Sequence, residues 1–421
     1  MESASAQSGA SGTRLHRRLL QLVAALVVAA VVGTVLLWPA SDELPTIPGM
    51  GTVRGTVVGV TEIDTRPDPH RDRSGRLADV VVELEEGALS GAREVVRIDR
   101  ATYPEFVPGD RVVLGTVRQG DGGPPSYYLA DFRRSSSLAT LAALFVCLVL
   151  VVGRWHGLRS LLGLLLSFAV IVRFVVPAIL AGSHPPTVAL IGATLIMVAT
   201  LYLTHGVSEM TTSAVIGTTA ALVVTVVLGT VFIGTSRITG LTSDDAMLAR
   251  LVVQGLDLQG LVLAGLIIAA LGVLDDVTVS QASTVFALRD TDPGLGLREL
   301  FGRAMKVGRD HIASVVNTLF LAYAGASLTL FVLFSVGGFG VGDHLNSEAM
   351  ATEIVKTIVG SIGLVLAVPL TTALASVLAL RMSPEQRRAA LASSGHVHTH
   401  GHGHAGTTSG DAPSEDVPNE G

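Results

Sequence analysis

Long apolar runs separated by short polar segments dominate the chain. Several runs reach about 18 residues or more, enough for a helix to cross a hydrocarbon core about 30 Å thick. The runs are continuous and do not alternate with polar residues, so they predict membrane helices and exclude a β-barrel. Eight spans are expected, at Leu19–Leu37, Leu138–Val152, Leu158–Leu180, Pro186–Leu203, Thr212–Ile233, Leu251–Leu274, Ile312–Val336 and Ile354–Leu380.

The first apolar run follows three arginines and has two interpretations, a cleaved signal peptide or an uncleaved anchor. Its apolar stretch exceeds the usual signal-peptide length of about 7–15 residues, and the bulky Trp38 spoils a small-residue cleavage pattern ending at Ala40. The anchor is therefore favoured, while cleavage stays open.

The pattern changes between the first two expected spans, where short runs of β-branched residues alternate with polar ones. Glycine, proline and aspartate separate these runs, which is typical of strands joined by turns. The expected strands are Gly51–Val60, Ala78–Leu84, Glu94–Ile98, Arg111–Val117 and Tyr127–Phe132. Four to six short strands in about 95 residues predict a small barrel of the OB type. It lacks the basic and aromatic surface of a nucleic-acid binder, so a docking or gating cap is favoured.

Five segments result from this pattern. They are a disordered cytoplasmic tail (1–18), a first transmembrane anchor helix (19–38), an extracytoplasmic β-rich domain (39–134), a seven-helix transmembrane domain (135–380) and a disordered His-rich cytoplasmic tail (381–421).

The orientation is predicted from arginine and lysine, which favour the cytoplasmic side of short loops. With a cytoplasmic N-terminus, thirteen basic residues lie inside and three outside. The inside ones are Arg14, Arg17, Arg18, Arg154, Arg159, Arg289, Arg298, Arg303, Lys306, Arg309, Arg381, Arg387 and Arg388; the outside ones are Arg237, Arg250 and Lys356. Both termini are therefore expected in the cytoplasm.

Composition agrees with a polytopic membrane protein. Apolar residues make up 49% of the chain, charged residues only 15%, and the mean hydropathy is +0.56. A net charge of −6 gives no reason to expect nucleic acid, and the single cysteine, Cys147, excludes a disulfide framework. Arginine far outnumbers lysine, which suits a GC-rich bacterial gene. The chain has no P-loop, zinc-protease or Gly-x-Ser-x-Gly motif, so neither an enzyme nor a cofactor is expected.

Ionisable residues within or beside the apolar runs are candidate site residues, because charges in a membrane usually face a bundle interior or water. Asp275 and Asp276 close the sixth expected span, and Ser280 follows Asp276 at helical spacing. Adjacent carboxylates favour a cation, an arginine partner or a retained proton. The alternative is an ordinary solvated helix end.

A second polar stripe begins the seventh expected span, where Asp310, Ser314 and Asn317 share one helix face. One interpretation is that these side chains only join neighbouring helices. We predict that both stripes face each other across a water-accessible pocket that opens inward and accepts a cation or proton. Arg173, in the third expected span, is a less certain partner, because it equally suits snorkelling or pairing with a carbonyl.

Five histidines alternate with other residues in the polar C-terminal tail: His396, His398, His400, His402 and His404. Neutral imidazoles in a flexible tract bind zinc, nickel or copper weakly, so metal buffering is one interpretation and low-complexity drift the other.

Two segments together resemble the YibE/F-like family of bacterial multi-span membrane proteins. They run from Gly272 to Ser283 and from Gly308 to Ser327. The resemblance covers roughly residues 138–380 and implies a plasma-membrane protein with many helices. It marks Asp275, Asp276, Asp310 and Asn317 as motif positions but carries over no catalytic residue and no substrate.

The favoured function is a permease or transport-associated protein that lies in the lipid bilayer and handles a small solute or ion. Pro177, Gly363 and Pro369 interrupt helices in a way that suits a site within the membrane. The alternative is a non-transporting scaffold or envelope-assembly factor whose β domain binds an envelope partner.

Overall fold

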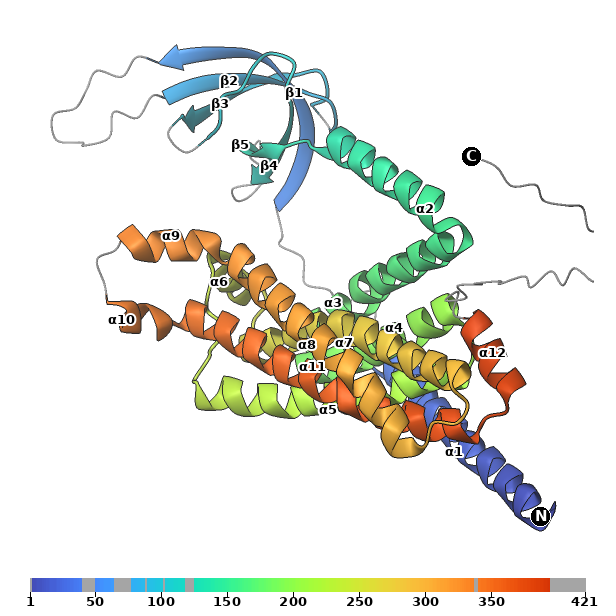
Figure 1. The fold of residues 1–421 in the computed structure, drawn as a ribbon. Coiled ribbons are helices and arrows are strands. Elements are labelled where there is room, and N and C mark those ends of the chain that lie inside the picture. Colours follow the sequence, from blue (N-terminus) through green and yellow to red (C-terminus); the bar gives the residue numbers. More distant parts are fainter. Residues whose placement is uncertain are drawn as a thin grey trace, which may run out of the picture.

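The structure is a computed structural model that describes residues 2–39, 50–63, 77–87, 89–100, 103–117, 125–336 and 340–393. It is mostly helical, with a small curled antiparallel sheet near the N-terminus (Figure 1). The strands are β1 Met50–Ile63, β2 Leu77–Leu84, β3 Arg93–Asp99, β4 Arg111–Val117 and β5 Ser126–Phe132. The helices are α1 Glu2–Leu36, α2 Ser135–Val170, α3 Val176–Leu180, α4 Pro185–His205, α5 Glu209–Thr235, α6 Asp244–Val252, α7 Leu258–Thr291, α8 Leu297–Ala326, α9 Leu328–Val336, α10 Val341–Leu345, α11 Glu348–Arg381 and α12 Pro384–Ser393.

The β sheet contains all five strand segments expected from the sequence. Its strand order is β3-β2-β1-β4-β5, and the long β1 pairs antiparallel with both β2 and β4. Alternate residues of β2 are buried, including Val80 and Val82, which pack with Val112 and Leu114 of β4 in a small apolar core. The alternation of apolar and polar residues therefore correctly predicted that one face of the sheet is buried.

On the exposed face of the sheet, charged side chains pair across neighbouring strands. Arg97 of β3 donates from Nε to Asp79 Oδ1 of β2 at 2.8 Å, and from Nη2 to Oδ2 at 3.0 Å. The hydrogen bonds from the Arg97 guanidinium hold the pKa of the Asp79 carboxyl below its ordinary value.

Within the described residues, six helical segments are long and apolar enough to cross a membrane. The segments are Arg18–Leu36, Ser135–Leu180, Pro185–His205, Glu209–Thr235, Leu258–Thr291 and Glu348–Arg381. Together α8 and α9 make a seventh candidate, bent by 57° at their break. Eight spans were expected from the sequence. These seven candidates are one fewer, because the expected spans Leu138–Val152 and Leu158–Leu180 lie on one helical stretch.

That stretch, Ser135–Leu180, is broken at Arg154, whose φ of 49° and ψ of −127° are not helical. At about 1.5 Å per residue, its 46 residues would be far longer than a bilayer is thick if they were straight. The break at Arg154 divides it at the point where the sequence predicted a loop.

Helix α7 also differs from the sequence expectation, because it begins at Leu258 and not at Leu251. Gly255 adopts a φ of +79°, which ends the preceding segment, and Asp257 caps the new helix by accepting a hydrogen bond from the Gly260 amide at 2.8 Å. The helix then continues to Thr291, so Asp275 lies at its middle and not at its end.

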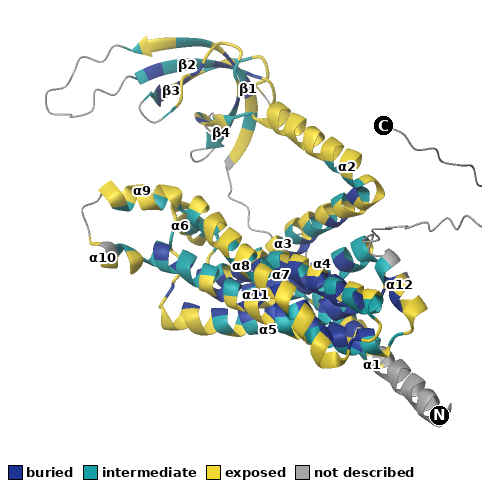
Figure 2. Cartoon of the chain, viewed as in Figure 1, coloured by how far each residue is buried: buried dark blue, intermediate teal, exposed yellow. Residues whose placement is uncertain are grey.

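Buried residues concentrate in α4, α5, α7 and α11, whereas α2 and α9 are largely exposed (Figure 2). Helix α11 contacts both α5 and α7, which also contact each other, so these three helices form the centre of the bundle.

Candidate functional site

Glycine residues allow the three central helices to approach closely. A β-carbon at Gly217 of α5 would lie only 2.0 Å from Thr371 Oγ1 of α11. One at Gly363 of α11 would lie 2.1 Å from Thr225 Oγ1 of α5. Small residues at such crossings let helix backbones pack tightly where lipid gives no hydrophobic drive to association. The α5–α11 crossing therefore depends on the missing side chains at Gly217 and Gly363.

One carboxyl group lies partly buried near this centre. Asp275 lies on the α7 face that meets α5, with its carboxyl within hydrogen-bonding reach of the Thr218 hydroxyl. Its Oδ1 is buried and has no hydrogen-bond partner among the described residues. A buried ion without full compensation costs several kcal/mol. A proton or a cation at Asp275 would offset that cost.

Two threonine hydroxyls lie beside Asp275. The Thr218 and Thr278 hydroxyls lie 2.7 Å apart across the α5–α7 interface, and both residues are fully buried. The Thr278 hydroxyl also donates to the carbonyl of Asp275 at 3.2 Å. These groups supply the oxygen atoms that a proton relay or a small cation uses.

The polar stripe continues along α7 to Gln281, which is 3% exposed. Its Nε2 donates to Thr372 Oγ1 of α11 at 2.7 Å and to the Ala304 carbonyl of α8 at 3.1 Å. The Gln281 amide thus links α7 to both α8 and α11.

Two further hydroxyls of α11 are fully buried, on Thr371 and Ser376. Their oxygen atoms have no hydrogen-bond partner within the described part of the chain. Native proteins rarely leave buried polar groups unpaired, so such groups call for an explanation such as a bound ion or a mobile proton.

The other candidates from the sequence lie at different places. Asp276, next to Asp275, is exposed and interacts electrostatically with His311 of α8. Ser280 is exposed on α7, and Asp310 and Ser314 are exposed on α8. The structure therefore brings α7 and α8 together at Asp276 and His311 but separates Asp275 from the α8 stripe.

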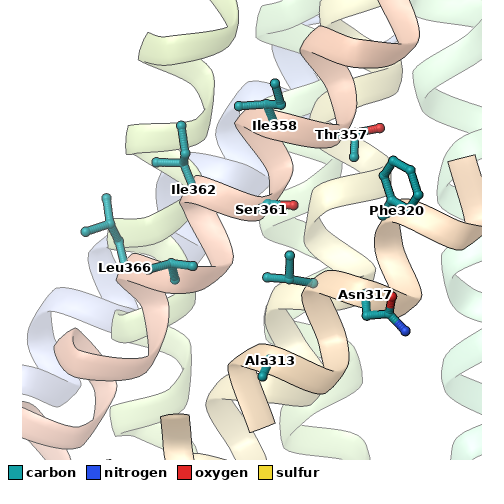
Figure 3. A pocket seen from close by; sticks show the side chains of 10 residues that line it. Ala313, Asn317, Phe320, Thr357, Ile358, Ser361, Ile362 and Leu366 are labelled. Carbon is teal, nitrogen blue, oxygen red and sulfur yellow. The ribbon is translucent and has the colours of Figure 1, made fainter. Parts of the chain in front are cut away.

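Asn317 lines a groove between α8 and α11, which is a surface separate from the enclosed Asp275. We call this hollow the α8–α11 groove; it has a volume of about 620 Å³ and is lined by Ala313, Val316, Asn317, Phe320, Thr357, Ile358, Ser361, Ile362, Val365 and Leu366 (Figure 3). Thr357 and Ser361 point from α11 toward α8, and the remaining lining is almost entirely apolar (Figure 3).

The groove exists because α8 leaves the bundle along its length. Its buried residues are Leu300, Ala304 and Gly308, all in its first half. A β-carbon at Gly308 would lie 2.6 Å from Val368 Cγ1 of α11, so the helices touch there. Beyond Gly308, α8 carries larger side chains such as Phe320, and the groove lies between this part of α8 and α11.

Arg173 lies in a π-helical turn, Ile171–Val175, and is exposed. The ring of its neighbour Phe174 stacks on Trp38, just beyond the end of α1, with 6.2 Å between ring centroids. Arg173 therefore lies at the level where α1 ends and not beside the central carboxyl.

The His-rich tail lies outside the described residues. In the part of the chain that the structure describes, no group of three or more histidine, cysteine or acidic side chains is placed to hold a metal ion.

Sequence reasoning missed the buried polar residues of the central helices, namely Thr218, Thr278, Gln281, Thr371 and Thr372. Threonine is common in membrane helices, and only the rotation of each helix decides which threonines face the bundle centre. A glycine beside a threonine, as at Gly217-Thr218, was a usable signal because it marks a close crossing.

Comparison with known proteins agrees with this architecture. A family described as YibE/F-like protein matches residues 141–381, more than half of the sequence. The chain belongs to the YibE/F-like family. The matched region runs from α2 to the end of α11 and includes Asp275 and the α8–α11 groove. This confirms the resemblance expected from the two polar segments. No match was found among curated proteins or among solved structures.

Proposed function

We propose that this YibE/F-like protein is a bacterial plasma-membrane permease that moves a small solute or ion and uses Asp275 as its proton or cation acceptor. The observation that carries the proposal is the carboxyl of Asp275, whose buried Oδ1 lacks a partner among the described residues and which lies beside the linked hydroxyls of Thr218 and Thr278. An ionisable residue within a membrane bundle marks an ion path or proton relay more often than a structural contact. No catalytic role and no cofactor are proposed.

In the proposed topology, both termini lie in the cytoplasm and the β sheet lies outside. The bias of basic residues supports this orientation. The strand order, together with contact between the edge strands β3 and β5, supports a partly closed barrel of the OB type. A reporter enzyme at Gly75, outside the described residues, tests the topology: the β domain is external if only a periplasm-active reporter works there.

The permease proposal is tested in proteoliposomes that contain the purified full-length protein. A pH-sensitive dye inside the vesicles follows proton entry under an imposed potential, and radioactive sodium follows cation entry. Asp275→Asn keeps the size of the side chain but removes its charge, so it is expected to abolish the flux that the wild type shows.

The matched control is Asp245→Asn, which removes an exposed carboxylate on α6. Flux that survives Asp275→Asn unchanged, in protein that inserts normally, contradicts the proposal. Asp276→Asn is a second comparison. The Asp276 carboxyl is exposed, so a smaller loss of flux is expected than in Asp275→Asn.

A non-transporting scaffold is the second candidate. It is favoured by the β sheet having an apolar core of its own, distinct from the core of the helices. Deletion of residues 39–134 separates the two: the permease retains Asp275-dependent flux without its β domain, whereas the scaffold loses its cellular function although the helices remain.

A further inference from the structure

Helix α12, which follows α11, packs against the end of α7 (Figure 1). It begins with a reciprocal cap: the Gln386 amide donates to Ser383 Oγ at 3.3 Å, and Gln386 Oε1 accepts from the Ser383 amide at 3.0 Å. Pro384 is the first residue of α12, where a missing amide hydrogen breaks no helical hydrogen bond. The local sequence thus starts a short helix directly after α11, and its next turn carries Arg387.

The guanidinium of Arg387 is buried at the junction of α7, α11 and α12, and the residue is only 3% exposed. Its Nη1 donates to the carbonyl of Met382 at 2.6 Å and to that of Ala379 at 3.5 Å, both at the end of α11. Its Nε is buried and has no hydrogen-bond partner among the described residues. A buried charge with an unused donor is costly, so an acceptor is expected there.

Arg289, near the end of α7, shows the same pattern. Its Nη1 donates to the carbonyl of Pro293 and, at 2.7 Å, to that of Leu295, and its Nε is also buried without a partner in the described part of the chain. Because Nη1 lies on the side of Cδ, these bonds do not use the opposite edge, which consists of Nε and Nη2. With that edge an arginine binds an oxyanion through two parallel hydrogen bonds.

Positive charge at this junction exceeds negative charge. Burial and, after it, the neighbouring Arg289 lower the pKa of Arg387 below its ordinary value; Asp290 opposes this effect and Arg388 adds to it. Asp290 also pairs with Arg388, with 3.6 Å between its Oδ1 and the arginine Nε. Three guanidinium groups therefore interact with one carboxylate, and an anion would offset the remaining charge.

The junction lies beyond the hydrocarbon core of a membrane. Helix α7 has 34 residues, and at about 1.5 Å per residue it is longer than a core of about 30 Å. Arg289 is among its last three residues. In the proposed topology this end faces the cytoplasm, so an anion reaches it from water or from the layer of lipid headgroups.

We propose that the junction of α7, α11 and α12 binds a phosphate group between Arg289 and Arg387. Phosphate has four oxygen atoms around one centre, so it accepts parallel hydrogen bonds from two guanidinium groups at once. The group belongs either to a soluble phosphate or to a lipid headgroup. Because Arg387 is almost fully covered, α12 lifts to admit the phosphate, which then holds α12 against α7. The site is argued without reference to transport.

The test measures binding to the purified, delipidated full-length protein in detergent. Equilibrium dialysis against radioactive inorganic phosphate, with chloride keeping the ionic strength constant, examines the soluble source. Native mass spectrometry with phosphatidic acid and diacylglycerol, two lipids that differ in one phosphate group, examines the headgroup source. We expect saturable binding of inorganic phosphate or, if the source is lipid, of phosphatidic acid in preference to diacylglycerol.

Three variants and a control locate the site. Arg387→Lys and Arg289→Lys keep the positive charge but lose the two-donor edge, so each is expected to weaken binding about tenfold. Asp290→Asn is expected to strengthen binding several-fold, because it removes a carboxylate that repels the anion; a merely structural role of Asp290 predicts no gain. The control is Arg303→Lys on α8, where an exposed, paired arginine changes and binding stays the same.

Absence of saturable binding of both inorganic phosphate and phosphatidic acid would overturn the proposal. Unchanged affinity in both lysine variants, or an equal loss in Arg303→Lys, would overturn it as well. Should Arg387→Lys fail to fold, Arg289→Lys and Asp290→Asn still decide the question. Neither measurement needs a membrane gradient, so lost phosphate binding with intact Asp275-dependent flux refutes this site alone, and lost flux with intact binding refutes the permease alone.

Discussion

The two sides of α11 show how one helix makes two unlike interfaces. Toward α5, glycine meets threonine at Gly217 and Gly363, and the backbones nearly touch. Toward α8, the tightest approach of a glycine is at Gly308, and Phe320 and Ile358 border an open groove. Small residues remove the space between helices and enclose polar groups, whereas large side chains on diverging helices leave a hollow.

The largest effect is expected from a methyl group at the tight crossing. In Gly217→Ala the new β-carbon would lie 2.0 Å from Thr371 Oγ1 and 3.0 Å from Thr371 Cβ. Overpacking of this kind costs about 1–3 kcal/mol of the free energy of unfolding, which SDS titration of the purified protein measures. The matched control is Gly325→Ala in α8, where no atom lies within 4 Å of the added carbon. That variant is expected to gain up to about 1 kcal/mol, because alanine favours a helix over glycine. Equal effects at both positions would refute the contrast between the two sides.

Gln281→Leu removes the amide that ties α7 to α11 and α8. Two interhelical hydrogen bonds are lost, and at about 0.6 kcal/mol each the free energy of unfolding falls by about 1 kcal/mol. Asn317→Leu, in the open groove, is the comparison and is expected to change the same quantity by less than about 0.5 kcal/mol. A larger loss of the free energy of unfolding in Asn317→Leu than in Gln281→Leu would show that Asn317 makes stabilising contacts across the groove.

Ser361→Leu places a larger apolar side chain in the α8–α11 groove. The groove has room for it, so the free energy of unfolding is expected to stay within about 0.5 kcal/mol of the wild type. Strong destabilisation in SDS titration would instead mean that α8 and α11 lie closer together than the structure indicates.

The smallest effect on stability is expected from the Asp79–Arg97 ion pair on the exposed face of the β sheet. Arg97 lowers the pKa of Asp79 in the folded state, so the pair stabilises the sheet above the ordinary pKa of the carboxyl, about 3.9, and loses this contribution as pH falls through the lowered folded value. Thermal unfolding of the sheet, followed by its infrared amide band, should therefore show a slightly smaller shift between pH 7 and pH 2 in Asp79→Asn than in the wild type. An equal or larger shift in the variant would contradict the role of the pair.

Sequence patterns predicted much of this fold, for identifiable physical reasons. The β strands followed from alternation, because a sheet with one buried face needs a period of two. The long helices followed from uninterrupted apolar runs. The start of α7 was misplaced because the left-handed turn at Gly255 divides an apolar stretch that hydropathy alone treats as continuous.

The candidate site was less predictable. Asp275 stood out because a carboxyl in an apolar run is costly and therefore rare. Its neighbour Thr218 comes from a helix far away in the sequence, and only the packing of α5 against α7 brings it near. Likewise, the spacing of Asp310, Ser314 and Asn317 identified one face of α8 but not the helix that this face meets.

Pro369 lies in α11 between the two sites that this helix borders. Proline has no amide hydrogen, so the carbonyl of Val365 loses its helical partner and α11 is easier to bend there. Val365 lines the groove, while Thr371 and Thr372, just beyond the proline, belong to the enclosed polar region. A bend at this point changes both sites together. Thermodynamic linkage then makes the effect mutual: whatever factor a molecule bound in the groove imposes on proton affinity at Asp275, protonation imposes the same factor on the affinity for that molecule.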